Sequence, residues 1–366
     1  MTALGLHGSR ILIGAGLLDQ CGADIRAALP GRRLAIISDE TVAPLYATRV
    51  AAALAPSPVT ILTIPAGEAS KTRKSWSRLT DELLDAGFGR DSAIIALGGG
   101  VVGDLAGFVA ATYMRGIPFV QMPTSLLAMI DAAIGGKTGV DTRAGKNLVG
   151  AFHHPALVIV DPRALSTLPL PHVRNGLAEA IKHGVIASRA EFEWIASNLA
   201  ALLREGGPAL ELTDRLVRRN IEIKSSIVAR DEREGGVRKS LNFGHTIGHA
   251  VESLSGYAML HGECIAVGMV AEARLAAILG VADRALAGTI AELCEAAGLP
   301  TSIPESMSPA AILEATRSDK KARAGAVEYA LPAKLGEMAG ADRGYSIPAP
   351  DAAVLDALSQ SHGVPH

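Results

Sequence analysis

Three of the ten histidines offer the clearest chemistry in this sequence. His245 and His249 are four residues apart, so that on a helix they share one face, and His261 follows soon after them. Neutral imidazoles arranged in this way, with a carboxylate from elsewhere in the chain, commonly hold a divalent metal ion. An isolated pair could equally be solvated or cap a helix, but the third histidine and the glycine-rich surroundings favour a metal site.

The missing carboxylate has one leading candidate, Glu179, which lies three residues before Lys182 in an apolar helical pattern. Taken alone, this pair is typical of an ordinary salt bridge within a helix, which contributes only roughly a few tenths of a kcal/mol. Asn242 lies about one helical turn before His245, and Arg238 lies about two turns before it. A guanidinium and an amide beside a metal indicate an anionic substrate that is rich in oxygen.

A glycine-rich turn indicates a second binding site. Residues 93–97 are an apolar run typical of a buried strand, and Gly98-Gly99-Gly100-Val101-Val102-Gly103-Asp104 leads from it into a predicted helix. Bare backbone N–H groups at the start of a helix suit a pyrophosphate, so the turn favours a nucleotide. The pattern is not the standard GxGxxG, however, and Asp104 could either accept hydrogen bonds from ribose hydroxyls or simply cap the helix.

Two further turns carry charged residues. Glu68 and Lys71 follow the predicted strand at residues 59–64, where they are either a second nucleotide contact or an ordinary surface turn. Asp131 lies in an apolar helical pattern, where an unpaired carboxylate would be costly, so we expect it to pair with Lys137 or Lys146. Both lysines adjoin glycine turns and could bind phosphate as mobile charges, or be solvated. Asp319-Lys320-Lys321 forms another basic cluster, by default a solvated one.

The elements that must position these residues change in type along the chain. Apolar strands alternate with helical segments in the first half, which predicts an α/β, Rossmann-like nucleotide-binding domain over residues 1–167 with a parallel sheet covered on both faces. Long amphipathic helices follow, which predicts an all-α metal- and substrate-binding domain over residues 168–366. The predicted strands are 11–13, 34–38, 59–64, 93–97 and 157–160, and the predicted helices include 76–86, 173–187, 208–230, 262–279 and 283–297.

The composition excludes several classes of protein. The chain has 366 residues, 49% of them hydrophobic and 20% charged, which is typical of a globular protein with two substantial cores. A formal net charge of −2 gives no electrostatic reason to expect nucleic acid or an anionic membrane as partner. The three cysteines are scattered, and neither a signal-peptide pattern nor a long apolar run is present, so we expect a cytoplasmic protein.

Taken together, these motifs resemble the 3-dehydroquinate synthase family, within the sugar phosphate cyclase superfamily, over nearly the whole chain. Many ordered matches carry the resemblance, and together they are far more specific than any single motif. They are Pro65-Ala66-Gly67-Glu68 with Lys71, Gly98 to Asp104, Tyr113-Met114-Arg115-Gly116, Asp131 with Gly135-Gly136-Lys137-Thr138-Gly139-Val140, Gly145-Lys146-Asn147, Glu179 with Lys182, Arg238, Leu241-Asn242-Phe243-Gly244-His245-Thr246, His249, His261-Gly262-Glu263 and Asp319-Lys320-Lys321.

The resemblance implies a role for each matching residue. Its metal ligands are Glu179, His245 and His261, usually for zinc with cobalt as the alternative, so that His249 becomes a hydrogen-bonding catalytic residue beside the metal. The implied NAD-binding residues are Glu68, Lys71, Gly100, Val101, Val102, Gly103, Asp104, Thr124, Ser125, Lys137, Lys146 and Thr167. The implied substrate-binding residues are Asp131, Lys137, Asn147, Lys182, Lys224, Arg238, Asn242 and either Lys320 or Lys321. Arg115 would reach the phosphate in a neighbouring subunit's site, which implies a homodimer.

The chain departs from the family's pattern at a few positions. Ser125 stands where a second threonine is common, and this change keeps the hydroxyl group. Ala132-Ala133 replaces a frequent serine pair, and Asp141 replaces a frequent asparagine. Asp141 adds a negative charge near the lysines, which leaves the finer substrate preference open, whereas Leu241-Asn242 matches the branch that forms dehydroquinate.

The resemblance also implies a reaction. The family converts 3-deoxy-D-arabino-heptulosonate 7-phosphate to 3-dehydroquinate and phosphate, in the shikimate pathway, by NAD-mediated transient oxidation, β-elimination, reduction and aldol cyclisation. A sibling cyclase that forms another carbocycle is one alternative, and an NAD- and metal-dependent polyol dehydrogenase is another. The lysines, Asn147 and Arg238 argue against the dehydrogenase, because a neutral polyol would not need them. A non-catalytic scaffold would not need these polar groups either.

Overall fold

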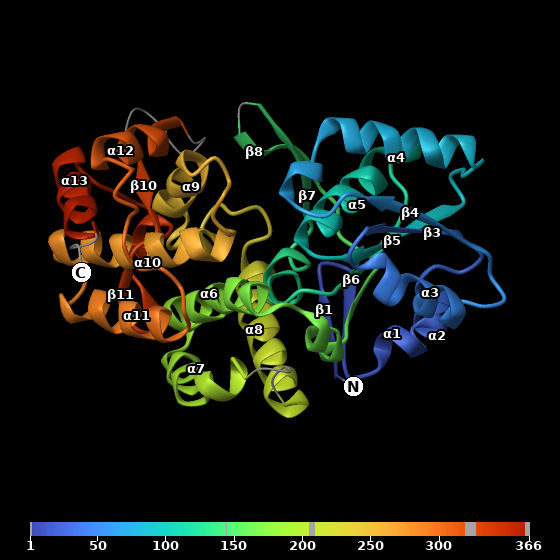
Figure 1. The fold of residues 1–366 in the computed structure, drawn as a ribbon, viewed down its shortest axis with the longest axis horizontal. Helices are drawn as coiled ribbons and strands as arrows, with labels where there is room; N and C mark the ends of the chain where they lie inside the picture. The colour runs from blue at the N-terminus through green and yellow to red at the C-terminus, as the bar shows by residue number, and fades with distance from the viewer. Residues whose placement is uncertain (1, 144, 205–208, 319–326, 363–366) are drawn as a thin grey trace. The chain divides into compact units, whose positions relative to one another are not determined.

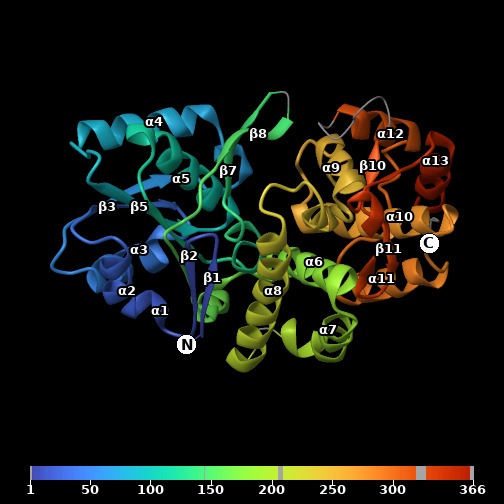
Figure 2. The same cartoon turned by 180° about the vertical axis from the view of Figure 1, so that it is seen from behind.

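The computed structural model describes residues 2–143, 145–204, 209–318 and 327–362, and the chain forms two compact units. The first unit consists of Met1–Leu168 and Ala209–Ile221, and the second of Pro169–Pro208 and Glu222–His366 (Figures 1 and 2). The stretch 209–221, which the predicted division at residues 167 and 168 assigns to the second domain, therefore belongs to the first unit. It is the first half of helix α8, Leu210–Arg230, so one helix contributes to both units.

A seven-stranded sheet forms the centre of the first unit. Its order is β1-β2-β9-β6-β5-β3-β4, and every neighbouring pair is parallel except β1 with β2. Helices α4 and α5 lie on one face of the sheet, and α1 to α3 lie on the other (Figures 1 and 2). The strands are β1 Thr2–Leu6, β2 Ser9–Ile13, β3 Arg33–Asp39, β4 Val59–Ile64, β5 Ser92–Gly98, β6 Phe119–Pro123 and β9 Leu157–Val160; the helices are α1 Leu17–Gln20, α2 Gly22–Ala28, α3 Ala43–Ala53, α4 Arg73–Asp85 and α5 Gly100–Thr112.

Parallel strands covered by helices on both faces must be apolar on both faces, so they appear in the sequence as continuous apolar runs. All residues of β5 and β9 are buried, as are six of the seven residues of β3. The α/β fold and all five predicted strands are confirmed. The structure adds β1 and β6 in the sheet and a separate antiparallel hairpin of β7, Lys137–Thr142, with β8, Gly145–Phe152.

The second unit is mainly helical. Helix α10 is buried over nearly its whole length because α6, α9 and α13 all pack against it. Two short strand pairs, β10 with β13 and β11 with β12, complete this unit. The helices are α6 Leu170–Ala187, α7 Arg189–Leu202, the second half of α8, α9 His245–Leu254, α10 His261–Ile278, α11 Ala285–Ala296, α12 Pro309–Ser318 and α13 Asp351–Gln360; the strands are β10 Glu328–Tyr329, β11 Pro332–Lys334, β12 Glu337–Met338 and β13 Ile347–Pro348.

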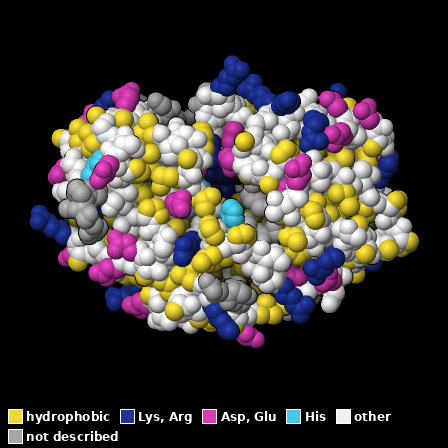
Figure 3. Space-filling view, in the orientation of Figure 1, with side chains coloured by type: hydrophobic (Ala, Val, Ile, Leu, Met, Phe, Trp, Pro, Cys, Tyr) yellow, Lys and Arg dark blue, Asp and Glu magenta, His cyan; other side chains and the backbone are white. Residues whose placement is uncertain are grey.

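The surface is mixed in charge. On the face shown in Figure 3, acidic and basic side chains are interspersed with apolar ones. Within the described part of the chain, no helix combines the length and the apolar character that crossing a bilayer requires.

Candidate active site

Three side chains from three helices of the second unit converge on one point. Glu179 lies in the middle of α6 and is fully buried, whereas His245 and His261 are the first residues of α9 and α10. One ligand atom from each residue lies within 4.8 Å of the other two. Oε1 of Glu179 is 3.5 Å from Nε2 of His245 and 3.6 Å from Nε2 of His261. We call these three residues the metal cluster.

The start of α9 places His245. The preceding residue, Gly244, has φ of +78°, and a Cβ there would lie 2.6 Å from Met269, so no side chain at this position can cap the helix. Glu272, a fully buried residue of α10, caps it instead. Its carboxylate accepts hydrogen bonds from the amides of Gly244, at 2.7 Å, and Ile247, at 3.0 Å.

The hydrogen bonding of His245 fits a metal ligand. Its Nδ1 is 3.1 Å from the carbonyl oxygen of Phe243, which can only accept, so this nitrogen carries the proton and the lone pair of Nε2 faces Glu179. Two imidazole nitrogens and one carboxylate oxygen form a donor set that suits zinc or cobalt and leaves a further position open. The residues therefore fit the implied metal.

The electrostatic environment of His261 favours positive charge. Burial lowers the pKa of this imidazole, but the facing carboxylates of Glu179 and Glu252 outweigh that effect and raise the pKa to about 9. A site that stabilises a proton in this way also stabilises a metal cation. His249 lies beside the metal cluster, with its ring centre 5.1 Å from that of His245 and 5.8 Å from that of His261, and its own close carboxylate is Glu252.

The same unit holds the cationic residues that the sequence singled out. Lys182 is 1% exposed and forms an ion pair with Glu179, and Lys224 is 7% exposed. Arg238 is 2% exposed, and its guanidinium donates to the carbonyl oxygen of Glu232. Buried cations are costly unless they are paired, and Glu179 meets this need for Lys182.

The loop before α9 shapes the surroundings of Arg238. Asp231 accepts hydrogen bonds from three backbone amides of this loop, at 2.7 to 3.0 Å, including that of Arg238. Burial raises the pKa of Asp231, but these amides and the guanidinium lower it more, so its pKa is below the ordinary value. Glu234 accepts a hydrogen bond from the side-chain amide of Asn242. Glu234 was not predicted from the sequence, because its position eight residues before Asn242 gives no periodic signal.

The glycine turn lies in the first unit, where β5 ends at Gly98 and α5 begins at Gly100. A Cβ on Gly98 would lie 2.6 Å from Val102, so the turn requires glycine there. The first helical hydrogen bond runs from the amide of Gly103 to the carbonyl of Gly99, at 3.0 Å, so the preceding amides have no partner within the helix. Thr124 donates its amide to the carbonyl of Gly98, at 2.9 Å, which places Thr124 and Ser125 beside the turn.

Four charged side chains gather next to this turn. Nζ of Lys71 lies 2.8 Å from Glu68, 3.4 Å from Asp104 and 3.7 Å from Asp141, and the lysine is only 5% exposed. We call these four residues the charge cluster. Burial raises the pKa of Asp104 to about 6, although Lys71 opposes the rise. For Glu68 burial raises the pKa, but Lys71 and Lys146 outweigh it, so the pKa is lowered.

The β7–β8 hairpin is joined to this cluster through Asp141. The amide of Asp141 donates to the carbonyl of Lys71, at 2.7 Å, and its carboxylate accepts from the amide of Asn147, at 2.9 Å. Asn147 adopts the left-handed region, with φ of +54°, and Lys146 lies 3.2 Å from Glu68. Asp141, treated above as a substrate-side departure, thus lies among the candidate nucleotide-binding residues.

The other candidate residues of the first unit lie on different elements of its fold. Asp131 lies on a helical turn, Ala128–Ala132, close before Lys137, which is exposed at the start of β7. Thr167 contacts the hydroxyl of Tyr46 at 2.7 Å. Asp39 was not predicted from the sequence. It ends β3 directly beside β5, and its carboxylate accepts hydrogen bonds from two backbone amides at 2.9 Å. An acidic residue at the end of the neighbouring strand is the signal that could have found it.

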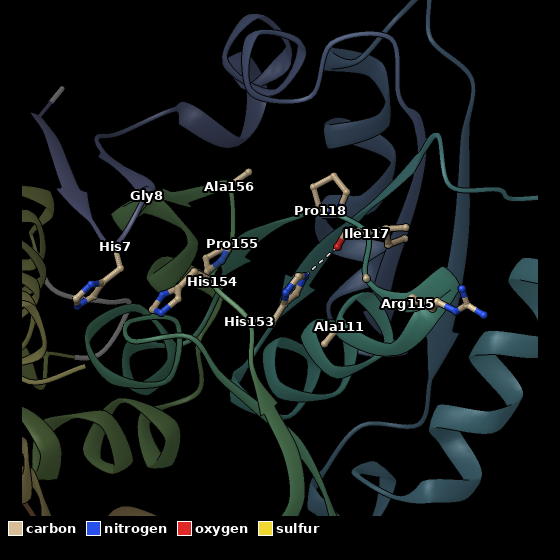
Figure 4. A pocket seen from close by; sticks show the side chains of 11 residues that line it. His7, Gly8, Ala111, Arg115, Ile117, Pro118, His153, His154, Pro155 and Ala156 are labelled. Carbon is tan, nitrogen blue, oxygen red and sulfur yellow. Dashed lines mark hydrogen bonds between the residues drawn. The ribbon is translucent and has the colours of Figure 1, made fainter. Parts of the chain in front are cut away.

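Arg115 is a residue of the first unit that is not part of the charge cluster. It follows α5 in the left-handed region, with φ of +69°, and lines a surface pocket of about 490 Å³ in the first unit (Figure 4). His7 and His154 line the opposite end of this pocket, with ring centres 5.3 Å apart, and the guanidinium of Arg115 points away from them. Lys320 and Lys321 lie outside the described residues.

A doubly wound α/β unit with a glycine turn, joined to a helical unit with a histidine–carboxylate cluster, defines a class of two-domain enzymes that combine a nucleotide with a metal. The family model for the 3-dehydroquinate synthase N-terminal domain matches residues 61–175, and that for the 3-dehydroquinate synthase C-terminal domain matches residues 176–322. The chain belongs to the 3-dehydroquinate synthase family.

Similar proteins agree with this assignment. A 3-dehydroquinate synthase from Symbiobacterium thermophilum is 47% identical over 332 residues, which cover 90% of this chain and 92% of the relative. A solved 2-deoxy-scyllo-inosose synthase, complexed with carbaglucose-6-phosphate, NAD+ and Co2+, has a TM-score of 0.88 at 26% identity and covers 98% of this chain and 100% of its own. The 2-epi-5-epi-valiolone synthase of Streptomyces hygroscopicus, with NAD+ and Zn2+ bound, has a TM-score of 0.84 at 29% identity and covers 98% of each chain.

Proposed function

We propose that this enzyme is a phosphate-eliminating lyase that converts 3-deoxy-D-arabino-heptulosonate 7-phosphate to 3-dehydroquinate and phosphate. The observation that carries the proposal is the 47% identity to a 3-dehydroquinate synthase over nine-tenths of both chains, compared with 26% and 29% to the two sibling cyclases. The metal cluster, the glycine turn and the buried cations supply the binding groups that this chemistry needs.

Glu179, His245 and His261 would hold zinc or cobalt. The metal, when bound, lowers the pKa of the substrate hydroxyl that is oxidised and polarises the resulting carbonyl group. The buried carboxylate of Glu179 balances the charge of the cation. His249, one turn along α9 from His245, is in position to hydrogen-bond to a substrate oxygen there.

The first unit would hold NAD, which would supply reversible hydride transfer at the substrate's C5. The amides of Gly100 to Gly103 would bind the pyrophosphate at the start of α5. Carboxylates of the charge cluster, together with Asp39, would accept hydrogen bonds from ribose hydroxyls. Thr124, Ser125, Lys137, Lys146 and Thr167 complete the proposed NAD set.

The remaining residues would bind the substrate and its phosphate. Oxidation at C5 acidifies the C6 proton, so a phosphate held close to that carbon can take the proton as it leaves. Lys137, Asn147, Arg238 and Arg115 would hold the phosphate in this position. The proposed contacts to the rest of the substrate are Asp131, Lys182, Lys224, Asn242 and Lys320 or Lys321.

The proposal includes a cytoplasmic homodimer. The three cysteines are free and buried, which accords with a reducing compartment. The variants R115A and H261A should each be inactive alone. If Arg115 acts in the partner's site, a mixed dimer has one complete site, because the R115A subunit keeps His261 and the H261A subunit supplies Arg115. Dimers reassembled from a mixture of the two should then regain activity, and light scattering would give the oligomeric state. An inactive mixture of proven heterodimers would contradict a role in the partner's site.

A coupled assay tests the function directly. Metal-loaded protein, NAD and the heptulosonate phosphate should release inorganic phosphate without net NADH, and dehydroquinate dehydratase should accept the product. Release of phosphate only from a different heptulose phosphate would instead support a sibling cyclase. Steady NADH accumulation on a polyol would support a dehydrogenase and overturn the proposal.

A further inference from the structure

The imidazole of His261 faces a carboxylate at each of its two nitrogens. Nε2 lies 3.6 Å from Oε1 of Glu179, within the metal cluster. Nδ1 lies 3.6 Å from Oε1 of Glu252, a residue of α9 that is only 3% exposed. Glu252 has no role in the function proposed above, yet burying a carboxylate is costly without a compensating interaction.

We propose that Glu252 is a positioning residue, which orients His261 and increases its strength as a metal ligand. An imidazole that presents the lone pair of Nε2 to a metal must carry its proton on Nδ1. The carboxylate of Glu252 lies 3.6 Å from Nδ1 and would accept that proton once the ring takes its ligand position, which would fix the tautomer and the ring plane and add electron density to Nε2. This inference rests on the proposed metal site of Glu179, His245 and His261.

The geometry of α9 explains how one helix serves both histidines. His245, His249 and Glu252 stand at positions i, i+4 and i+7, so that all three lie along one face of the helix. The first of them is itself in the metal cluster, and the last reaches across to the ring of His261 on α10. A single rigid element therefore sets the position of two ligands.

His245 and His261 differ in the acceptor that faces Nδ1. In His245 the acceptor is the neutral backbone carbonyl of Phe243, at 3.1 Å, whereas in His261 it is a charged carboxylate. A charged acceptor polarises the imidazole more strongly than a carbonyl does. We therefore expect His261 to be the stronger donor of the pair and to depend on Glu252 for this strength.

The test measures metal binding without the reaction. The dissociation constant for zinc is determined by competition with a chromophoric chelator, and the visible spectrum of the cobalt-loaded protein reports the ligand field. E252A should weaken zinc binding by about 10- to 100-fold and shift the cobalt bands, because loss of such a partner has this effect in other metal sites. E252Q keeps a hydrogen-bond acceptor without the charge and should fall between E252A and the wild type.

E263Q is the matched control. Glu263 is on the same helix as His261, and its carboxylate accepts from the amide of Leu260, at 2.8 Å, so the same change there weakens only the start of α10. Zinc binding by E263Q should stay within about threefold of the wild type, in line with the loss of a helix cap alone. Thermal unfolding of the metal-free proteins shows whether each variant is folded.

Three results would overturn the proposal. Zinc affinities and cobalt spectra of E252A and E252Q that match the wild type would mean that Glu252 has no influence on the metal. An E252A variant that fails to fold while E252Q is unchanged would make Glu252 a packing residue. Loss of metal as complete as in E179A would make it a ligand. Failure of the wild type itself to bind zinc would instead contradict the metal site, so the two failures are distinguishable.

Discussion

The metal cluster and the charge cluster use carboxylates in opposite ways. In the metal cluster, Glu179 faces two histidine nitrogens, and each of the three residues supplies a separate ligand atom. In the charge cluster, a single buried cation, Lys71, is shared among Glu68, Asp104 and Asp141. The first arrangement concentrates positive charge on one point, and the second spreads negative charge around one cation.

This difference predicts how each cluster responds to substitution. A metal with three protein ligands loses a large part of its binding energy with any one of them, so changes in the metal cluster should have near-complete effects. In the charge cluster the remaining carboxylates keep Lys71 in place, and the pyrophosphate would be held by backbone amides that no side-chain change removes. Substitutions there should have graded effects.

The largest effect is expected for H261A. Removing one of three ligands should lower the bound metal and the rate of phosphate release together, by about 1000-fold or more in rate if the metal supplies several kcal/mol. Metal content is measured by mass spectrometry alongside the assay. H172A, which changes an exposed histidine at the start of α6, is the control and should retain both. An active, metal-replete H261A protein would refute its role as a ligand.

R238A should have the next largest effect, and it should weaken binding of the substrate but not binding of NAD. Loss of this buried guanidinium should weaken binding of the phosphorylated substrate by about 100-fold, because a charged hydrogen bond to phosphate is lost, and leave NAD binding nearly unchanged. The Michaelis constant for substrate and the dissociation constant for NAD are compared. K239A alters the neighbouring, partly exposed cation and serves as the control. Equal losses for substrate and NAD would sink the phosphate assignment.

Local sequence predicted the parts of the fold that local pattern determines. Apolar strands and amphipathic helices gave the parallel sheet and the helical second half, because burial on one or two faces leaves a period in the sequence. The β7–β8 hairpin was missed, since Lys137 and Lys146 each lie beside glycines and the stretch resembles phosphate-binding loops. Strand β6 was missed because Gln121 interrupts its apolar run and Pro123 ends it.

The types of residue in the site could be predicted from the sequence, but which of them contact one another was harder to predict. Spacing alone paired His245 with His249, whereas the structure brings His261 to Glu179 because three helices converge. That convergence is a property of tertiary packing. The residues alone indicated Glu179 as the carboxylate, but only the family resemblance indicated His261 in place of His249 as the second imidazole ligand. Buried carboxylates such as Glu252 and Glu272 were missed for the same reason. On a helix their spacing is that of solvated residues, and their role is visible only from what packs against them.

D104N tests the charge cluster through pH. Burial raises the pKa of Asp104 to about 6, above that of an unfolded aspartate, so its contribution to stability is fully present below about pH 4 and is lost as the pH rises through 6. An asparagine is neutral throughout, so D104N should gain stability relative to the wild type as the pH rises. Between pH 5 and pH 7.5 we expect a relative gain of about 1 kcal/mol in urea unfolding. A difference in the free energy of unfolding that stays constant across this pH range would mean that Asp104 does not titrate there.

The smallest effect is expected for D141N, and it decides to which site Asp141 belongs. Asparagine keeps an oxygen that can accept from the amide of Asn147, so the hairpin should hold its shape, and only the charge near Lys71 is removed. Because Glu68 and Asp104 still surround Lys71, NAD affinity should change by no more than about fivefold, an exposed-pair energy of about 1 kcal/mol. The Michaelis constant for substrate should not change. A shift in substrate constant or in preference among heptulose phosphates, with NAD affinity unchanged, would move Asp141 to the substrate side. The charge cluster would then contribute to the choice of sugar phosphate and not to the binding of NAD.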